Sequence, residues 1–197
     1  MAYLTSNRLL IIGAGGHGQS VAEAAELSGK FQVLGFLDDS FSSEADVLGR
    51  PVLGNLDSLP LFRSLFDTVI IAIGNNYVRQ KLMHQVADAG YPIATVIHPQ
   101  AYVAPSAQLG PGSSVMSGAI VGTAANLGMG VIVSSGAVVD HHARVDDFGH
   151  LGVNASMAGG TVLGSCAWMQ AGSSIAYGVA LEAGTILLPA QGVSENN

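Results

Sequence analysis

The feature that most constrains the fold is a six-residue repeat that runs without insertion through the second half of the chain. Four places after the first residue of each of the first fourteen repeats stands Gly, Ala, Ser or Thr, or Val in two cases. An inward aliphatic residue, an inward small residue and a tight turn in every six residues build a parallel β-helix, in which three repeats make one coil of about 18 residues. The fifteen aliphatic or methionine positions that begin the repeats are Val103, Leu109, Val115, Val121, Leu127, Val133, Val139, Val145, Leu151, Met157, Leu163, Met169, Ile175, Leu181 and Leu187.

The repeat also predicts where the chain turns. Three places after the aliphatic position, the residue is Gly in eight of the first fourteen repeats and Asn in one. Gly adopts a left-handed backbone without the steric penalty of a Cβ atom, and Asn tolerates that conformation better than most residues. We therefore expect left-handed corners at Gly112, Gly118, Gly130, Gly136, Asn154, Gly160, Gly172, Gly178 and Gly184.

Before the repeat, short apolar runs alternate with helical segments, which is typical of βαβ units. Val78, Leu82 and Val86 recur at helical spacing, and Gly90 supplies a stop. Short apolar strands between helices indicate a small Rossmann-like parallel sheet covered on both faces. We expect two domains, residues 1–98 and 99–197. The predicted strands lie in 8–14, 31–39, 67–74 and 92–98, and the predicted helices in about 17–27 and 75–90.

Composition excludes several classes of protein. The formal net charge of −7, with only seven Lys and Arg, leaves no basic surface for nucleic acid. The longest apolar runs are far shorter than the roughly 20 residues that span a bilayer. The single Cys166 permits no intrachain disulfide, and MAYLTSNRLLIIG lacks a signal-peptide pattern, so we expect a cytoplasmic protein without a membrane span.

The segment GAGGHG, residues 13–18, satisfies G-x-G-x-x-G between a predicted strand and a predicted helix. Asp38 and Asp39 end the next strand, which completes the pattern of a dinucleotide site. Only about 90 residues precede the repeat, enough for one mononucleotide-binding half, so a nucleotide-sugar diphosphate fits better than NAD. Two alternatives remain open: an NAD oxidoreductase, and glycines that serve only close packing of strand and helix.

Three histidines, His141, His142 and His150, lie within ten positions. His142 and Phe148 occupy the glycine-favouring corner place of adjacent repeats, an exception that indicates a role beyond folding. The alternatives are solvent-facing corner residues and a zinc site, for which three ligands would have to converge. His150 follows His141 by half a coil, so the two belong to different faces of the prism.

The segments GAGGHGQSVAE, GFLDD, AIGNNYVRQKL and VIHP, followed by hexapeptides carrying DHHARVDDFGH, resemble the sialic-acid O-acetyltransferase-like family nearly from end to end. Its best-known branch comprises N-acetyltransferases of nucleotide-linked 4-amino sugars, in UDP-N-acetylbacillosamine and GDP-perosamine biosynthesis. The resemblance implies a left-handed β-helix and a homotrimer with active sites between subunits. It also implies acetyl-CoA as co-substrate, a UDP- or GDP-4-amino-4,6-dideoxyhexose as acceptor, surface glycan biosynthesis as the context, and no metal.

The resemblance also implies roles for individual residues. His141 matches the general base of the family, and His150 matches a contact to acetyl-CoA. Gly159 and Ala171 fall on later positions that the family uses for acetyl-CoA. The sugar-nucleotide contacts fall on Gly15, Gly16, His17, Asp38, Asp39, Gly74 and Asn75. Asn75 or Asn76 has an alternative role as a helix N-cap.

Two departures from the family pattern bear on these expectations. His142 stands where the family has a carboxylate that orients the base and stabilises its imidazolium form, and Asp140, Asp146 or Asp147 could supply that charge instead. The end of the chain, LLPAQGVSENN, stops where relatives commonly add a further hexapeptide. The resemblance therefore does not define the residues of the outer part of the coenzyme site. Cys166 sits in an ordinary corner and is not expected to be a nucleophile. The alternatives are O-acetylation of a sialic-acid-type hydroxyl and a non-catalytic sugar-nucleotide-binding protein.

Overall fold

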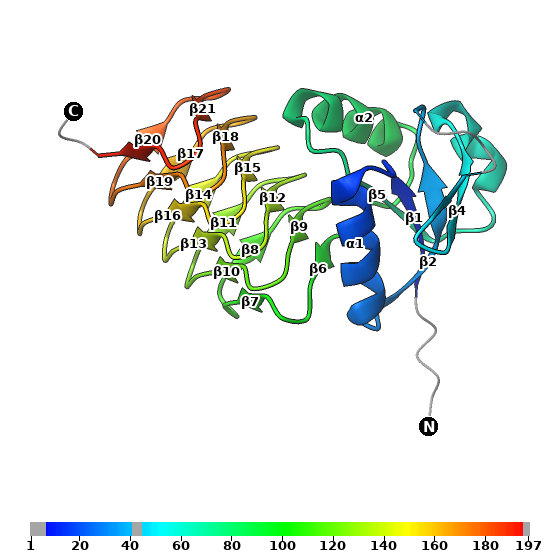
Figure 1. The fold of residues 1–197 in the computed structure, drawn as a ribbon, viewed down its shortest axis with the longest axis horizontal. Coiled ribbons are helices and arrows are strands. Elements are labelled where there is room, and N and C mark those ends of the chain that lie inside the picture. The colour runs from blue at the N-terminus through cyan, green and yellow to red at the C-terminus, as the bar shows by residue number, and fades with distance from the viewer. Residues whose placement is uncertain (1–6, 41–44, 195–197) are drawn as a thin grey trace.

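A computed structural model describes residues 7–40 and 45–194 of the chain. It has an N-terminal domain with a five-stranded sheet and a second domain of stacked triangular coils (Figure 1). Residues 1–6, in the segment MAYLTSNRLLIIG, and residues 195–197, at the end of LLPAQGVSENN, lie outside the described residues. The expected fold class, a Rossmann-like domain followed by a left-handed parallel β-helix, is confirmed.

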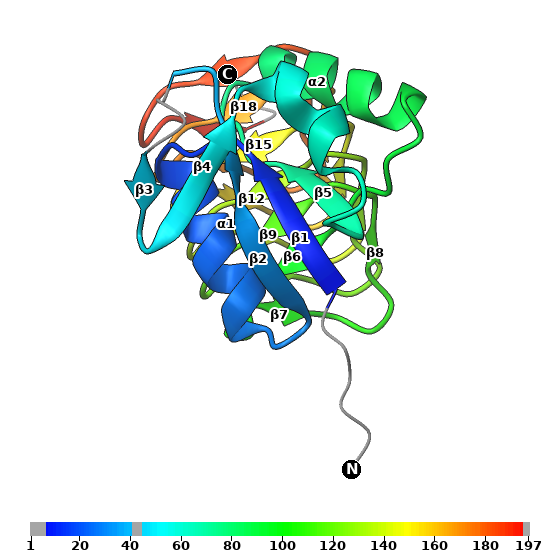
Figure 2. The same ribbon diagram turned by 90° about the vertical axis from the view of Figure 1, so that its right-hand side faces the viewer.

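The N-terminal sheet has the strand order β3-β4-β2-β1-β5, and its four main strands are parallel (Figure 2). Because β1 lies between β2 and β5, the strand order reverses there, and the carboxyl ends of β1 and β5 form the crevice where such sheets bind ligands. The elements are β1 (Asn7–Ile12), α1 (Gly16–Leu27), β2 (Phe31–Leu37), β3 (Asp46–Val47), β4 (Arg50–Gly54), the 3₁₀ helix η1 (Leu56–Phe62), β5 (Thr68–Ile71) and α2 (Asn76–Asp88).

Both predicted helices are present, but α2 buries a different face from the one its apolar spacing suggests. Val78 is 43% exposed, whereas Asn76, Arg79 and Met83 are buried together with Val86. The reason is that α2 packs against the second domain through polar as well as apolar side chains.

The repeats form the three faces of a prism, and each two-residue strand pairs in parallel with the strand 18 residues away. The first face holds β6 (Val96–Ile97), β9 (Ser114–Val115), β12 (Ile132–Val133), β15 (His150–Leu151), β18 (Trp168–Met169) and β21 (Ile186–Leu187). The second face holds β7 (Tyr102–Val103), β10 (Ile120–Val121), β13 (Val138–Val139), β16 (Ser156–Met157), β19 (Ser174–Ile175) and β22 (Gly192–Val193). The third face holds β8 (Gln108–Leu109), β11 (Asn126–Leu127), β14 (Arg144–Val145), β17 (Val162–Leu163) and β20 (Ala180–Leu181).

The residue that begins each repeat points into the prism and, with the small residue four places later, forms one continuous apolar core. Every corner expected to be left-handed has a positive φ. From Ala124 onward, the corners without glycine or asparagine have the same conformation, with φ of 58° at His142 and 61° at Phe148. The hexapeptide period therefore fixes the backbone of the corner even where the residue is not glycine.

The two domains meet through both helices. α1 lies beside β6, and α2 lies along one edge of the prism (Figure 1). This edge, which we call the α2 corner column, consists of Gly112, Gly130, Phe148, Cys166 and Gly184. A helix of 13 residues is about 20 Å long, and four steps between stacked strands at about 4.8 Å cover nearly the same length.

Phe148 departs from glycine because of this contact. Its side chain is 1% exposed and packs edge to face on the ring of His84, with centroids 5.5 Å apart. The interpretation of Phe148 as a sign of a role beyond folding is therefore wrong, because the ring is part of the apolar contact between the domains. His142, by contrast, is exposed.

Within the described ranges 7–40 and 45–194, no helix is both long enough and apolar enough to cross a membrane.

Candidate active site

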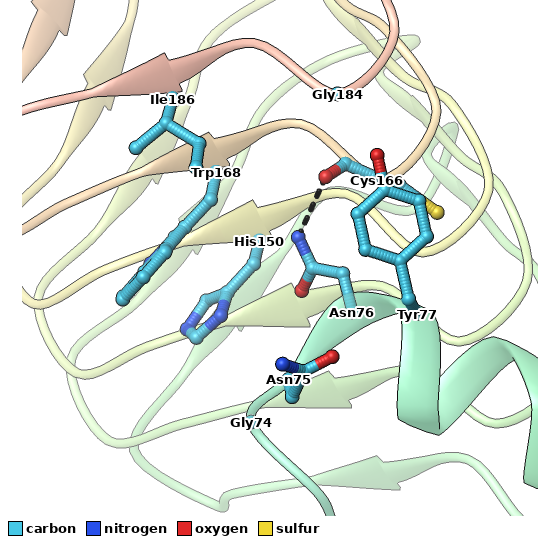
Figure 3. Close-up of a pocket in the computed structure, with 9 residues that line it drawn as sticks. All are labelled: Gly74, Asn75, Asn76, Tyr77, His150, Cys166, Trp168, Gly184 and Ile186. Carbon is cyan, nitrogen blue, oxygen red and sulfur yellow. Dashed lines mark hydrogen bonds between the residues drawn. The ribbon is translucent and has the colours of Figure 1, made fainter.

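A cavity of about 490 Å³ lies between the N-terminal end of α2 and the first face of the prism (Figure 3). One wall comes from the N-terminal domain and the other from the outward side chains of β15, β18 and β21. Figure 3 shows the lining residues: Gly74, Asn75, Asn76, Tyr77, His150, Cys166, Trp168, Gly184 and Ile186.

His150 lies in the prism wall of this cavity. Its ring stacks on Trp168, with centroids 5.6 Å apart and planes inclined by 19°, because paired residues of adjacent strands stand directly above one another. Its Nε2 lies 3.4 Å from the hydroxyl of Ser134, and its buried Nδ1 has no hydrogen-bond partner within the described part of the chain. Burial, followed by the positive charge of Arg79 and by coupling to His17, lowers the pKa of His150 to about 3, so this imidazole is neutral at physiological pH.

The opposite wall is the turn from β5 into α2. The side chain of Asn75 accepts a hydrogen bond from the Val78 amide at 3.1 Å, which confirms Asn75 as the N-cap of α2. Asn76 is buried, and its Nδ2 donates to the carbonyl oxygens of Cys166 and Ala167. No atom lies within 4 Å of where a Cβ on Gly74 would stand, so this glycine leaves the cavity open.

The glycine loop divides into packing residues and open residues. A Cβ on Gly18 would overlap the carbonyl oxygen of Gly13, and Gly13 itself has a φ of 106°. Around Gly15 and Gly16, in contrast, a Cβ would meet nothing within 4 Å. Close packing therefore explains Gly13 and Gly18 only, and the remaining two glycines leave the N-terminal amides of α1 accessible to an anion.

His17, the other residue of this loop expected to contact the sugar nucleotide, is directed toward the prism. Its Nε2 lies 3.3 Å from the hydroxyl of Ser114 on β9. Burial, aided by the charge of Arg79, lowers the pKa of His17 to about 4, so it is neutral as well.

A second cavity, of about 450 Å³, opens at the carboxyl ends of β1, β2 and β5. Asp38 and Asp39 line it, together with Lys81, which the sequence did not single out. The carboxylate of Asp38 accepts hydrogen bonds from the amides of Ala14 and Ser40, so it holds the glycine loop in place. Asp39 accepts from the amide of Leu56 through one oxygen.

His141 lies on a different edge of the prism, at the corner after β13. Its side chain is 49% exposed, and its Nδ1 is 3.2 Å from the Nδ1 of His142. The nearer oxygen of Asp140 stands 3.8 Å from the Nε2 of His141, beyond hydrogen-bond distance.

The two other carboxylates considered as replacements for the missing charge are engaged elsewhere. Asp146 pairs with Arg144 at 3.0 Å, and Asp147 accepts from the amide of Met129 at 2.9 Å. The direct partner of the His141 imidazole is therefore His142, with the Asp140 carboxylate nearby.

Gly159 stands one coil above His141, and Tyr177 stands one coil above Gly159. A Cβ on Gly159 would overlap Cε1 and Nε2 of the His141 ring. The rings of His141 and Tyr177 approach to 6.5 Å between centroids across this glycine. Gly159 therefore makes the space that the His141 imidazole occupies.

Within one chain the expected site residues lie at separate places and do not form one cluster. Gly74, Asn75 and His150 share the first cavity, and Asp38 and Asp39 share the second. His141, His142 and Gly159 are together at the corner after β13, whereas Ala171 is exposed at the corner after β18. Sequence reasoning missed Trp168 and Ile186, although both follow His150 at multiples of 18 residues.

The three clustered histidines do not converge on one point. Within residues 7–40 and 45–194, no three His, Cys, Asp or Glu side chains are arranged as metal ligands.

A Rossmann-like half with an open glycine loop, joined to hexapeptide coils that carry an exposed histidine pair, defines the class of two-domain hexapeptide acyltransferases. The family model of the PglD N-terminal domain matches residues 8–86. Perosamine N-acetyltransferase (PerB) of Caulobacter crescentus, solved with CoA and GDP-perosamine, is 34% identical, and the match covers 97% of this chain and 93% of that chain with a TM-score of 0.84. The chain belongs to the family that contains these N-acetyltransferases of nucleotide-linked amino sugars.

Two more relatives support this assignment. The acetyltransferase domain of PglB from Neisseria gonorrhoeae, solved with acetyl coenzyme A, is 34% identical over 96% of this chain and 94% of its own, with a TM-score of 0.72. The curated UDP-N-acetylbacillosamine N-acetyltransferase of Bacillus subtilis (strain 168) is 32% identical over 110 residues, 54% of this chain. The chain spans 50% of the length of this curated relative.

The two kinds of loop glycine predict opposite effects of substitution. Gly18→Ala should destabilise the fold by about 1–3 kcal/mol, because the new methyl group overlaps the backbone of Gly13. Gly15→Ala should leave the melting temperature unchanged and weaken binding of a nucleotide-linked sugar by about tenfold or more, because a methyl group would stand between phosphate and amides. Thermal melts and calorimetric titration of both variants measure this. Equal stability loss in the two would contradict it.

The space above His141 yields another prediction. Gly159→Ala should displace the His141 ring and lower kcat by about 100-fold, the size of effect expected when a reacting group moves by about 1 Å. The matched control is Gly192→Ala on β22, where a Cβ would make only an ordinary contact at 3.4 Å with the Ser174 hydroxyl. Both glycines have ordinary backbone angles, so a similar kcat in the two variants would show that Gly159 does not make room for His141.

Proposed function

We propose that the protein transfers the acetyl group of acetyl-CoA to the amino group of a nucleotide-linked amino sugar. The observation that carries this proposal is the exposed imidazole of His141, whose Nδ1 is engaged by His142 while its Nε2 has no hydrogen-bond partner in the described chain. A base that must remove a proton from an amine needs such a free ring nitrogen. The relatives that cover nearly the whole chain are N-acetyltransferases of this kind.

The nucleotide end of the acceptor belongs in the N-terminal domain. Gly15 and Gly16 leave room for a diphosphate at the N-terminus of α1, which has no side-chain cap. The second cavity, beside Asp38 and Asp39, provides space for the nucleoside, and Lys81 in its wall adds a positive charge. The sugar then points toward the wall formed by Gly74 and Asn75.

The chemistry requires one base and no covalent enzyme intermediate. The amine attacks the carbonyl carbon of the thioester, the C–N bond forms, and Nε2 of His141 takes the proton of the amine. Backbone N–H groups of the coil stabilise the oxyanion. When the C–S bond breaks, the imidazolium returns its proton to the thiolate, which leaves as CoA.

The histidine pair sets the tautomer of the base. A hydrogen bond between two Nδ1 atoms holds one proton, so one ring donates and the other accepts. If His141 donates through Nδ1, its Nε2 carries the lone pair that the reaction needs. His142 then takes over the orienting part of the role that a carboxylate has in the family, with the charge of Asp140 close by.

His150 is suited to contact the acetyl-CoA thioester region. Its neutral imidazole and the stacked Trp168 form a largely apolar wall, which matches the uncharged pantetheine arm better than a charged site would. Gly159 and Ala171 are proposed to line the remainder of the coenzyme path along the outside of the coils. No metal takes part in this proposal.

A homotrimer would complete the active site. His141 and the cavity at His150 belong to different edges of one prism, so a neighbouring prism must bring the base of one chain to the cavity of another. Exposed apolar side chains beside His141 and in the cavity at His150, such as Tyr177 and Trp168, are consistent with burial in such an interface. We place the protein in the cytoplasm, in the synthesis of surface glycans.

The central test combines a substrate panel with one variant. UDP-, GDP- and CMP-linked sugars with a free amine or only hydroxyls are incubated with acetyl-CoA, and acetylated product is measured. We expect product from an amine-bearing UDP- or GDP-sugar. His141→Ala should lower kcat by about 100-fold or more while leaving nucleotide-sugar binding intact. A structure of the perosamine relative with alanine in place of one histidine still contains CoA and GDP-perosamine.

The outcome separates the alternatives. Product from hydroxyl-bearing sugars only would favour O-acetylation. Binding of nucleotide sugar without any product would favour a non-catalytic binding protein. Full turnover by the His141→Ala variant would exclude His141 as the base.

The role of His142 gives a further prediction. His142→Ala should lower kcat by about tenfold, because the His141 ring loses the partner of its Nδ1. Alanine already stands at the left-handed corners Ala124 and Ala190, so the backbone should be kept. His142→Glu should retain turnover. As the pH is lowered, kcat/KM of this variant should begin to fall at a higher pH than in the unsubstituted protein, because a carboxylate stabilises protonated His141. An unchanged pH profile in both variants would exclude this role.

A further inference from the structure

The largest of the fully buried side chains is a cation. Arg79, on the inner face of α2, is 1% exposed, and within residues 7–40 and 45–194 no carboxylate pairs with it. Burial lowers its pKa only to about 10, so the guanidinium remains charged at neutral pH. Buried charges are normally paired because their desolvation is costly, so an unpaired one requires an explanation.

The guanidinium is instead held by five oxygen atoms from both domains. Its Nε donates to the carbonyl of Gly130 at 2.7 Å and its Nη2 to the carbonyl of Phe148 at 2.8 Å, both in the prism. Its Nη1 donates to the carbonyls of Ile73 at 2.8 Å and Gly74 at 3.2 Å, in the N-terminal domain. The fifth bond runs from Nη2 to the side-chain oxygen of Asn76 at 2.8 Å.

The prism offers these carbonyls because of its left-handed corners. In the α2 corner column the amides of Gly130, Phe148 and Cys166 each donate to the coil below, but their carbonyls face α2. Arg79 satisfies the carbonyls of Gly130 and Phe148, and Asn76 satisfies that of Cys166. The motif NNYVR therefore contacts three successive coils.

These contacts join the two walls of the first cavity. Gly74 and Asn76 belong to one wall, and Phe148 lies two residues before His150 in the other. A shift of the guanidinium would move both walls. Lysine has three donors on a flexible chain and cannot replace this planar set of five.

We propose that Arg79 is a positioning residue for the proposed acetyl transfer: its guanidinium fixes the start of α2 against the coils that carry His150 and Trp168. Its uncompensated charge has a second effect. Its Nη2 is bonded to the carbonyl of Phe148, two residues before His150, so the charge lies close to that imidazole. Together with burial, it disfavours protonation of His150 and of His17, so His150 stays a neutral hydrogen-bonding group. Tyr77 and Cys166 are the other titratable residues that line the same cavity. The first part is geometric and the second electrostatic, and two substitutions separate them.

The experiment compares Arg79→Lys, which keeps the charge, with Arg79→Gln, which removes it. Both variants lose the five-bond geometry, so kcat should fall by about 10- to 100-fold in each. In selectively labelled protein, the NMR titration midpoint of His150 should stay unchanged in Arg79→Lys and rise by about one pH unit or more in Arg79→Gln. Arg63→Gln is the matched control, because this arginine of the same domain lies over Tyr91, away from the cavity, and should change neither.

Each result bears on the proposal. An unchanged kcat in Arg79→Lys overturns the positioning role, and an unchanged His150 midpoint in Arg79→Gln overturns the electrostatic one. If both variants fail to fold, two other measurements decide. In the unsubstituted protein, the Nε–H of Arg79 should exchange with solvent far more slowly than that of Arg63. In the variant Asn76→Ala, kcat should fall while the His150 midpoint stays unchanged. Fast exchange at Arg79 would overturn the proposal. Because exchange and titration need no turnover, failure of the proposed acetyl transfer would be recognised separately.

Discussion

The structure depends on the parallel pairing of residues 18 positions apart, which stacks outward side chains of the prism into columns. Each column has its own environment. The column of His150, Trp168 and Ile186 lines the first cavity, and the column of His141, Gly159 and Tyr177 presents the proposed base. The α2 corner column contacts the N-terminal domain. The position of a residue within the 18-residue period thus decides which surface of the prism it lies on. The residue type at that position can differ from one coil to the next.

The period explains why so much of the second domain could be predicted. Inward and corner positions follow from a single repeat, and the backbone keeps that conformation even at His142 and Phe148. What could not be predicted is where the other domain makes contact. An arginine in a helical sequence is expected to face solvent, so the sequence does not predict that Arg79 and Met83 lie on the buried face of α2. For the same reason the sequence suggests a functional role for Phe148, whereas its ring packs between the domains. Contacts between domains leave no periodic signal in either one.

The site combines groups that remain neutral with one that remains charged. Burial lowers the pKa of His17 and of His150, so both are neutral. Arg79 stays ionised because five oxygen atoms at 2.7–3.2 Å replace its hydration. The exposed pair of His141 and His142 is built differently, with the two rings oriented by each other and open to solvent. Burial therefore distinguishes His17 and His150, which stay neutral, from the exposed His141 that we propose as the base.

The length of α2 sets a limit on how such a protein can vary. The helix spans the corners from Gly112 to Gly184, four coil steps, and touches several of them through side chains of fixed reach. An insertion of one whole coil inside that span would preserve the β-helix but carry His150 and Trp168 one step away from their counterparts on α2. An extra coil beyond Gly184 would leave the span untouched. Growth of the solenoid without loss of the cavity is therefore confined to the end remote from the N-terminal sheet.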